Sequence, residues 1–366
     1  MAKHNAANER IKREYFRFLA EAKGRDTATI DRVAKSLARF ENSTGHKDFK
    51  RFHREQAMAF KRRLLAQVNA RTGETLSKAT VHSTLREVKT FFEWLAREPG
   101  YRSHISFADA DYLSPNEKDV AIARARRERP FPSLEQVEAV LDAMPAATAL
   151  ERRNRALVAF TAITAARVNA LRTFRVGNVN IPQSYVEQDA RTVATKFAKS
   201  FRTWFMPVSD RAQEIVGDWV RELREDHLRG ESDALFPGTA MGLGEAGGFQ
   251  PQGLARDGWD STGPIREVFR RAFASAGLPY FNPHSFRFML VRHAMTLDLS
   301  PEEMKAWSQN LGHADVMTTF VSYGRVPVQR QGDLIRSAKS LKGDGVGQDR
   351  IGVLEDMLRE LRRNRA

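Results

Sequence analysis

The sequence of 366 residues contains no cysteine. Disulfide bonds, thiolate metal sites and cysteine nucleophiles are therefore excluded, and the composition fits a reducing cytoplasm. The chain also lacks any apolar run near the roughly 20 residues that a membrane span needs. Its first residues lack the apolar core of a secretory signal. Since 42% of the residues are hydrophobic and 28% are charged, we expect a soluble protein of two folded domains.

Acidic residues are too few to balance the basic ones. The chain has 59 lysines and arginines against 45 aspartates and glutamates, a net charge of +14. Residues 1–130 carry 28 basic and 17 acidic side chains, a net +11, whereas residues 131–366 carry 31 and 28, a net +3. Such an excess indicates a polyanionic partner, most simply nucleic acid, and a basic surface without a ligand is the alternative. We expect a cationic clamp in the first third of the chain.

The basic first third is predicted to form a bundle of helices. Apolar residues recur at helical spacing in four segments, residues 10–22, 27–45, 53–68 and 76–98. In the last segment Ser77 is the predicted N-cap. The opposite face of its apolar stripe carries three basic side chains, Lys78, Arg86 and Lys89. We predict that these three residues contact a nucleic-acid backbone.

A second domain is predicted after a polar, charged linker over residues 113–130. It contains helical patterns, which cover residues 132–144, 152–174, 211–226, 263–277, 284–298 and 301–312. Residues 188–210 change to a pattern typical of a β-hairpin with a basic turn. Residues 238–263 hold eight glycines and are predicted to form a long flexible loop. The fold class is therefore mainly α with a small β-sheet.

Cationic side chains suited to phosphate chemistry occur in three separate segments of this second domain. Arg167 lies in an otherwise apolar stretch, where a buried guanidinium must find an anion. His284 and Arg287 are three residues apart, so on a helix they point the same way. Lys196 lies at the predicted hairpin tip beside Lys199. Two arginines can hold the oxygens of one phosphate, while a histidine or a lysine can transfer a proton.

A candidate nucleophile follows near the end of the chain. His313 belongs to a Leu-Gly-His motif, and Tyr323, one of only six tyrosines, lies ten residues later. A tyrosine hydroxyl can attack phosphorus. Each residue also has an ordinary structural interpretation: a core histidine, a salt-bridged arginine, a solvated lysine or an aromatic ring packed at a helix end. Only their combination within one basic chain favours a shared active site.

In this order, the segments TAARVNAL, TKFAKS, HSFR and LGH together with Tyr323 resemble the catalytic set of the tyrosine recombinases, the phage integrase family. The segment LSKATVHSTLREVKTFFEWL also resembles the last helix of the family's core-binding domain. The resemblance implies a helical, SAM-like core-binding domain in residues 1–112 and a mixed α/β catalytic domain in residues 131–340. It covers most of the chain.

The resemblance also implies a role for each catalytic residue. Arg167 and Arg287 would hold the scissile phosphate, and Lys196 would be the general acid. His284 would orient or activate the nucleophile, and His313 would occupy the family's His/Trp position. Tyr323 would attack and form a 3′-phosphotyrosine. No metal ion or ATP would be needed, since guanidinium groups stabilise the charge and the phosphotyrosine bond conserves the phosphodiester energy.

The partners implied by the resemblance are double-stranded DNA and three further copies of the chain, which form a tetramer on two DNA sites. Accessory proteins are possible partners, no membrane is involved, and the expected location is the cytoplasm of a bacterium, at the nucleoid. A mobile-element transposase, a chromosome-dimer resolvase and a type IB topoisomerase remain alternatives that use a similar catalytic set. A non-catalytic DNA-binding relative is the alternative from another class.

Three features depart from the family pattern. An acidic residue often lies three positions after the first arginine, where this chain has Ala170, and Thr164-Ala165 replaces the family's Thr-Gly. The spacing from His313 to Tyr323 is ten positions, one more than the commonest spacing in the family.

After the catalytic domain, residues 341–366 are predicted to form a glycine-rich tether and a short amphipathic helix, with its apolar stripe at Ile351, Leu354, Leu358 and Leu361. This helix would dock on its own domain, on a neighbouring subunit or on another protein.

Overall fold

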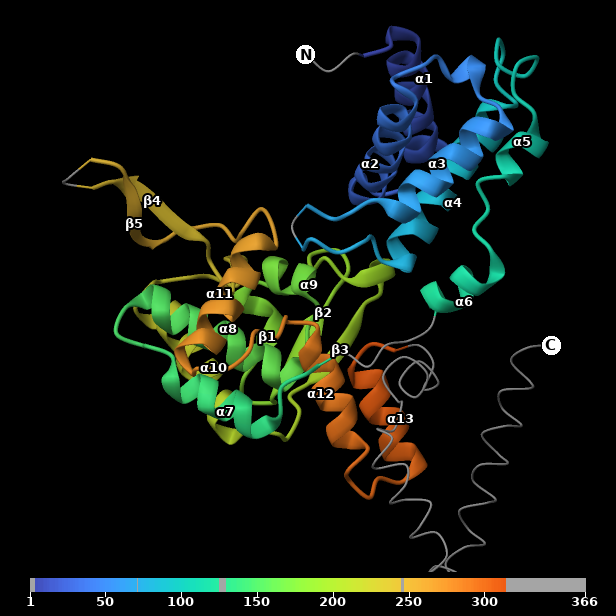
Figure 1. The fold of residues 1–366 in the computed structure, drawn as a ribbon. Helices are drawn as coiled ribbons and strands as arrows, with labels where there is room; N and C mark the ends of the chain where they lie inside the picture. Colours follow the sequence, from blue (N-terminus) through green and yellow to red (C-terminus); the bar gives the residue numbers. More distant parts are fainter. Residues whose placement is uncertain (1–3, 71, 125–129, 245–246, 314–366) are drawn as a thin grey trace, which may run out of the picture. The chain divides into compact units, whose positions relative to one another are not determined.

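The computed structural model describes residues 4–70, 72–124, 130–244 and 247–313, and Figure 1 draws them as a ribbon coloured along the chain. The chain divides into two compact units, residues 1–127 and 128–366. Tyr323 and the predicted tail helix in 341–366 lie outside the described residues. Among the helices of the described ranges, none is both long enough and apolar enough to span a membrane.

The first unit consists of helices. They are α1 (Ala6–Arg17), continued by a π-helical turn (Phe18–Ala22), α2 (Thr27–Thr44), α3 (Arg54–Ala66), α4 (Lys78–Leu95), α5 (Phe107–Asp111) and α6 (Glu117–Arg124). The four predicted helical segments are confirmed as α1 to α4. The predicted linker over residues 113–130 contains α6, which packs against α4.

Local sequence signals explain where the helices of the first unit begin and end. The Ser77 side chain accepts a hydrogen bond from the Thr80 amide and caps α4, as predicted. Gly45 ends α2 in a left-handed conformation with φ of 65°. The apolar stripes meet in one core, in which the rings of Phe52 and Phe92 stack with centroids 3.7 Å apart. The first unit therefore has a hydrophobic core of its own.

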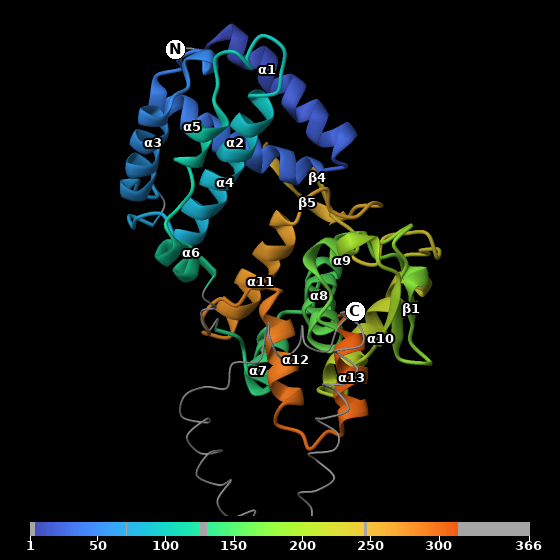
Figure 2. The same ribbon diagram turned by 90° about the vertical axis from the view of Figure 1, so that its right-hand side faces the viewer.

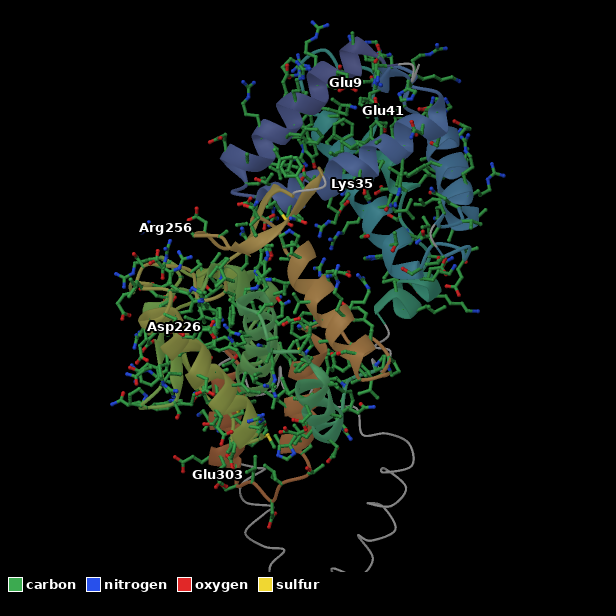
Figure 3. All side chains as sticks on the ribbon, turned by 90° about the vertical axis from the view of Figure 1, so that its left-hand side faces the viewer. Glu9, Lys35, Glu41, Asp226, Arg256 and Glu303 are labelled. Atoms are coloured by element: carbon green, nitrogen blue, oxygen red, sulfur yellow. The ribbon has the colours of Figure 1, made fainter. Side chains whose placement is uncertain are left out.

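A partly buried polar network connects α1 to α2 within this unit. Lys12 Nζ lies 2.7 Å from Glu9 Oε1 and 2.5 Å from Glu41 Oε2, and Figure 3 labels both carboxylates. The Asn8 amide, which is fully buried, donates to Glu41 Oε1 at 3.1 Å. Hydrogen bonds to the two carboxylates raise the pKa of Lys12 in spite of the opposing effect of burial. The network fixes the two helices side by side.

The second unit is built around α8. Its elements are α7 (Leu134–Ala143), α8 (Ala149–Thr164), α9 (Val168–Thr173), β1 (Val179–Asn180), β2 (Tyr185–Gln188), β3 (Phe201–Trp204), α10 (Asp210–Glu225), β4 (Thr239–Leu243), β5 (Phe249–Leu254), α11 (Gly263–Ser275), α12 (Ser285–Ala294) and α13 (Pro301–Asn310). Helices α7, α10 and α11 pack against α8, and Figure 2 shows the unit from a second side. The observed fold is mainly α with small sheets, as predicted.

Two antiparallel sheets complete the second unit. Strands β1, β2 and β3 are ordered as in the chain, and β2 and β3 form a hairpin, in which Tyr185 pairs with Trp204 and Gln188 with Phe201. A hairpin was predicted over residues 188–210, but its first strand ends at Gln188, so the first half of the predicted segment lies in the connecting loop. The prediction of a flexible loop over residues 238–263 was wrong, because β4 and β5 pair there as a second hairpin. The many glycines in this segment interrupt the alternation of apolar and polar side chains that would indicate strands. The strands pair through main-chain hydrogen bonds, which the sequence pattern does not reveal.

The prediction of one helix over residues 152–174 was also wrong, because the chain breaks at Ala165. Helix α8 ends at Thr164, Ala165 adopts a left-handed conformation with φ of 47°, and α9 begins after Arg167. The Thr164 hydroxyl donates to the Phe160 carbonyl at 2.6 Å and accepts from the Ala166 amide at 3.2 Å. The side chain of Thr164 thus satisfies main-chain groups at the end of the helix.

Candidate functional site

Arg287 connects three segments of the second unit. Its side chain, which is 2% exposed, projects from α12. Nη1 donates to the carbonyl of Ala165 at 2.9 Å, and Nη2 donates to the carbonyl of Leu311. Nη2 also lies 3.1 Å from His313 Nε2. The break after α8 and the turn after α13 are therefore held around one guanidinium group.

The contact with Arg287 sets the protonation state of His313. A guanidinium group is always a donor, so Nε2 of His313 must accept and its ring proton must lie on Nδ1. Burial and, in decreasing order, electrostatic interactions with Arg287, Arg167 and His284 together lower the pKa of His313 to about 3. His313 is therefore a neutral imidazole at physiological pH, in a strongly positive site.

Arg167 reaches this site from the break between the two helices. It is the N-cap residue of α9 and is half-buried. Its charge acts on His313, so the two side chains share one electrostatic environment. Ala170, at the position where the family often has an acid, is only 1% exposed. A carboxylate there would be buried, and this chain places a methyl group in the core instead.

His284 directly precedes α12 as its N-cap residue and is exposed. Its main-chain amide donates to Asn282 Oδ1 at 3.0 Å, and its ring meets that of Phe288 edge-on at 5.6 Å. The structure thus exposes His284 and buries Arg287, although both belong to one turn. His284 also interacts electrostatically with His313.

Lys196 lies on the long loop that joins β2 to β3. The loop spans residues 189–200 and contains a 3₁₀ turn, Lys196–Ala198, on which Lys196 is exposed. The amide of Ala194 donates to Thr173 Oγ1 at 2.8 Å and attaches the loop to the end of α9. The amide of Ala190 donates to Ser200 Oγ at 2.9 Å and closes the neck of the loop. The loop is therefore anchored to α9, the helix that Arg167 precedes.

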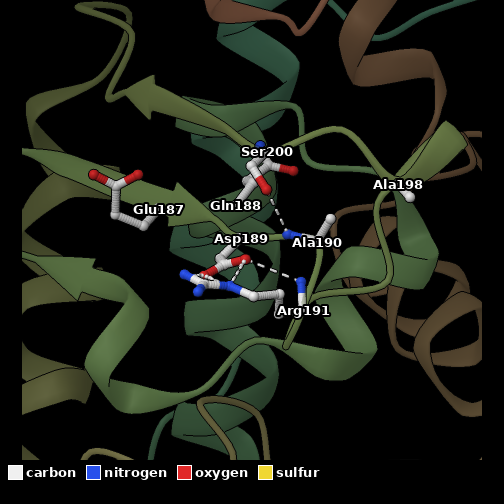
Figure 4. Close-up of a pocket in the computed structure, with 7 residues that line it drawn as sticks. All are labelled: Glu187, Gln188, Asp189, Ala190, Arg191, Ala198 and Ser200. Atoms are coloured by element: carbon white, nitrogen blue, oxygen red, sulfur yellow. Dashed lines mark hydrogen bonds and ion pairs between the residues drawn. The ribbon is translucent and has the colours of Figure 1, made fainter.

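A shallow pocket of about 550 Å³ lies at the neck of this loop (Figure 4). It is lined by Glu187, Gln188, Asp189, Ala190, Arg191, Ala198 and Ser200. The ion pair with Arg191, at 2.5 Å, lowers the pKa of Asp189 to about 2. The pocket is not lined by Arg167, His284, Arg287 or His313. We therefore take the cluster of side chains around Arg287, and not this pocket, as the candidate active site.

Sequence reasoning missed Asn310, the last residue of α13. Its Oδ1 accepts from the amide of Trp204 at 2.6 Å, and its Nδ2 donates to the carbonyl of the same residue at 2.9 Å. The next residues, Leu311 and His313, are the two that contact Arg287. The signal available in the sequence was a polar side chain directly before Leu-Gly-His.

The four predicted backbone contacts stand in different surroundings. Lys78 lies 2.8 Å from Asp119, and Lys89 lies 2.7 Å from Asp111. Arg86 and Lys199 are exposed. Their DNA contacts stay predictions, and Arg86 is the member of the α4 set whose charge is most accessible. Within the described residues, no three His, Asp or Glu side chains gather in a group that could hold a metal ion.

Comparison with known proteins gives one family. The sequence model of the phage integrase family matches residues 133–330. The tyrosine recombinase XerD of Oceanobacillus iheyensis is 22% identical over 268 residues, which cover 71% of this chain and 76% of the relative. Tyrosine recombinase XerC 2 of Ralstonia nicotianae is 27% identical over 259 residues, 70% of this chain and 64% of that protein.

Solved structures share the fold. A lambda integrase fragment crystallised as a dimer on a core site covers 85% of this chain and 93% of its own, with a TM-score of 0.57 and 14% identity. The integrase of transposon Tn1549, in complex with a circular intermediate DNA, covers 89% of this chain and 98% of its own, with a TM-score of 0.54 and 12% identity.

Proposed function

The chain belongs to the phage integrase family, and from this premise we propose that it is a tyrosine-type site-specific DNA recombinase. The observation that supports the proposal most strongly is the site around Arg287. Burial lowers the pKa of His313 most, and the two arginines that lie near it lower that pKa further, so the ring stays neutral. Cations that converge in this way repel one another, and a phosphate group would offset that repulsion.

The proposed cleavage step assigns one task to each side chain. Arg167 and Arg287 bind the non-bridging oxygens of the scissile phosphate and stabilise the charge that develops there. The hydroxyl oxygen of Tyr323 attacks phosphorus and loses its proton to His284. The bond from phosphorus to the 5′ oxygen breaks, and Lys196 gives that oxygen its proton. The products are a 3′-phosphotyrosine and a free 5′-hydroxyl.

His313 supports the step as a hydrogen-bonding group. Since Nε2 accepts from Arg287, the ring proton on Nδ1 is the one that can be donated. Rejoining reverses the reaction, with a 5′-hydroxyl of the partner DNA as the attacking group. No metal ion or nucleotide enters the scheme, because the phosphodiester energy is kept in the phosphotyrosine bond. Four copies on two DNA sites would exchange the strands, and the basic first unit would hold the duplex.

A recombination assay tests the proposed function. Two DNA duplexes that carry the junction sequences flanking the gene are mixed with purified protein in EDTA and without ATP. We expect both recombinant junctions with the wild-type protein and none with Tyr323→Phe, which should bind DNA as before because only a hydroxyl is removed. Recombination that requires added metal or ATP, or that survives in the Phe variant, would contradict the proposal.

A further inference from the structure

The four residues Asn310 to His313 contact two different parts of the site in alternation. Asn310 and Gly312 contact β3, the strand that follows the loop of Lys196. Leu311 and His313 contact Arg287. A single stretch of main chain therefore lies between the loop that carries the proposed general acid and the arginine that would hold the phosphate.

Asn310 is bonded to β3 in the manner of a neighbouring strand. Strand β3 is at the edge of its sheet, and edge strands leave main-chain groups without a ladder partner. The Asn310 side chain accepts from the Trp204 amide at 2.6 Å and donates to the Trp204 carbonyl at 2.9 Å. The side-chain amide of Asn310 thus forms the two hydrogen bonds that a peptide group of a fourth strand would form. It forms them with one residue of β3, Trp204.

Two further contacts hold the base of the loop to the same stretch. Thr203 Oγ1 donates to the Asn310 carbonyl at 3.0 Å and accepts from Gln188 Nε2 at 2.8 Å, so both strands of the hairpin are included. The ring of Phe201 lies so close to Gly312 that a Cβ atom there would be 2.5 Å from it. Gly312 also has φ of 68°, which a side chain would disfavour. Gln188 and Phe201 are the strand residues that flank the loop of Lys196.

We propose that Asn310 is a positioning residue, which fastens the hairpin of Lys196 to the turn that holds Arg287 and His313. The inference rests on the proposed function, because it assigns Lys196 as the proton donor to the leaving 5′ oxygen. Asn310 itself touches neither the phosphate nor the proton. It sets the distance between the acid and the bound phosphate, and proton transfer depends on such geometry.

A DNA substrate with sulfur in place of the bridging 5′ oxygen can distinguish a role of Asn310 in positioning Lys196 from a general role in stabilising the fold. A thiolate is a far better leaving group than an alkoxide and leaves without a proton. Loss of a correctly placed Lys196 should therefore slow cleavage of the oxygen substrate and spare the sulfur substrate. Loss of Arg287 should slow both, because both need the phosphate charge to be stabilised.

The test is single-turnover cleavage of both substrates by Asn310→Leu, with DNA binding and thermal melting measured alongside. We expect the oxygen substrate to be cleaved at least about tenfold more slowly, a part of the roughly 10²–10⁴ that a positioned general acid contributes. The sulfur substrate should be cleaved within about twofold of the wild-type rate, the same rescue as for Lys196→Ala. Asn310→Asp, which keeps the acceptor for the Trp204 amide, should show a smaller defect with the same rescue.

Asn180→Leu is the matched control. Asn180 lies on β1 of the same sheet, and its amide donates to the Tyr185 hydroxyl at 3.2 Å. It should cleave both substrates within about twofold of wild type. Equal slowing of both substrates by the Asn310 variants, or no slowing of either, would overturn the inference. Failure of the wild-type protein to cleave either substrate would instead contradict the proposed function.

Discussion

At the scale of single residues, Arg287 has a structural role and a proposed catalytic role. Its bonds to the Ala165 and Leu311 carbonyls hold the site together, and the same group would stabilise the charge on the phosphate. Such a residue cannot be tested by loss of activity alone. Arg153 provides a comparison, since it is 4% exposed and donates to the Pro237 carbonyl at 2.9 Å and to Thr239 Oγ1 at 3.2 Å, away from the site.

We predict that Arg287→Ala and Arg153→Ala both lower the free energy of unfolding, because each leaves buried acceptors without a donor, at a cost of about 1–3 kcal/mol for each group. Only Arg287→Ala should also slow single-turnover cleavage, by roughly 10²–10³. Both variants are assayed at a temperature where circular dichroism shows them folded. Cleavage by Arg287→Ala within about threefold of that by Arg153→Ala would refute the assignment.

His313 makes a prediction about pH. Its pKa is 6.5 in the unfolded chain and is lowered to about 3 in the folded protein. Between these values the unfolded chain binds the proton more tightly, so the contribution of His313 to stability is complete above pH 6.5 and is lost as the pH falls toward 3. The difference in unfolding free energy between wild type and His313→Asn should therefore shrink from about pH 7.5 to pH 5, as measured by urea titration. A difference that does not vary with pH would show that His313 is not buried as a neutral ring.

At the scale of the elements, the break between α8 and α9 decides where Arg167 lies. Ala165 is fully buried, and its φ of 47° is a conformation that favours glycine. The structure thus gives a physical reason for the Thr-Gly that the family resemblance led us to expect at Thr164-Ala165. It also gives a reason why the sequence misled us, because alanine is the best helix former and no local signal marks the break.

Two alanine-to-glycine changes test this explanation. Ala165 and Ala156 are both fully buried, but Ala156 lies inside α8. Ala156→Gly should destabilise the protein through lost helix propensity and a lost methyl group, whereas Ala165→Gly recovers roughly 1–2 kcal/mol of left-handed strain. We expect Ala165→Gly to be the less costly of the two by about 1–2 kcal/mol in chemical unfolding. Equal costs would mean that the break carries no strain.

The elements that the sequence predicted well are those that carry their own signal. The helices α2 and α4 have apolar stripes and caps, and the caps lie at Asp26, Gly45 and Ser77. The hairpin β4–β5 was missed because glycines carry no stripe. The candidate residues of the site could be named from sequence motifs. The hydrogen bonds between Asn310 and Trp204 could not, because they join residues 106 positions apart. Contacts of that kind depend on tertiary packing, which periodicity does not contain.

At the scale of the whole molecule, charge is concentrated in the first unit, and residues 1–130 carry a net +11. Because this unit has its own core, a fragment of residues 1–127 should fold and bind duplex DNA. Its affinity should fall steeply with salt, since each neutralised phosphate releases a counterion. A fluorescence anisotropy titration at several salt concentrations measures this, and an affinity that does not depend on salt would mean that the charge serves only as a solvated surface.

Two neighbouring residues of α4 refine that prediction. Arg86 is exposed, whereas Lys89 is already paired with Asp111 at 2.7 Å. Arg86→Ala should reduce the slope of log affinity against log salt by about 0.9, the value for one phosphate contact. Lys89→Ala should change the slope less, because its charge is partly neutralised before DNA binds. The opposite order would move the DNA-binding face to the side of α4 that carries Lys89.

The proposed cleavage step depends on Tyr323, which lies outside the described residues and is assigned from its sequence position alone. Its most direct test is to trap the protein on a nicked DNA substrate, digest the adduct with protease and nuclease, and locate the modified residue by mass spectrometry. We predict a single modified peptide, in which Tyr323 carries a 3′-linked nucleotide phosphate. A nucleotide on any other residue, or no covalent adduct from a preparation that binds the DNA, would contradict it.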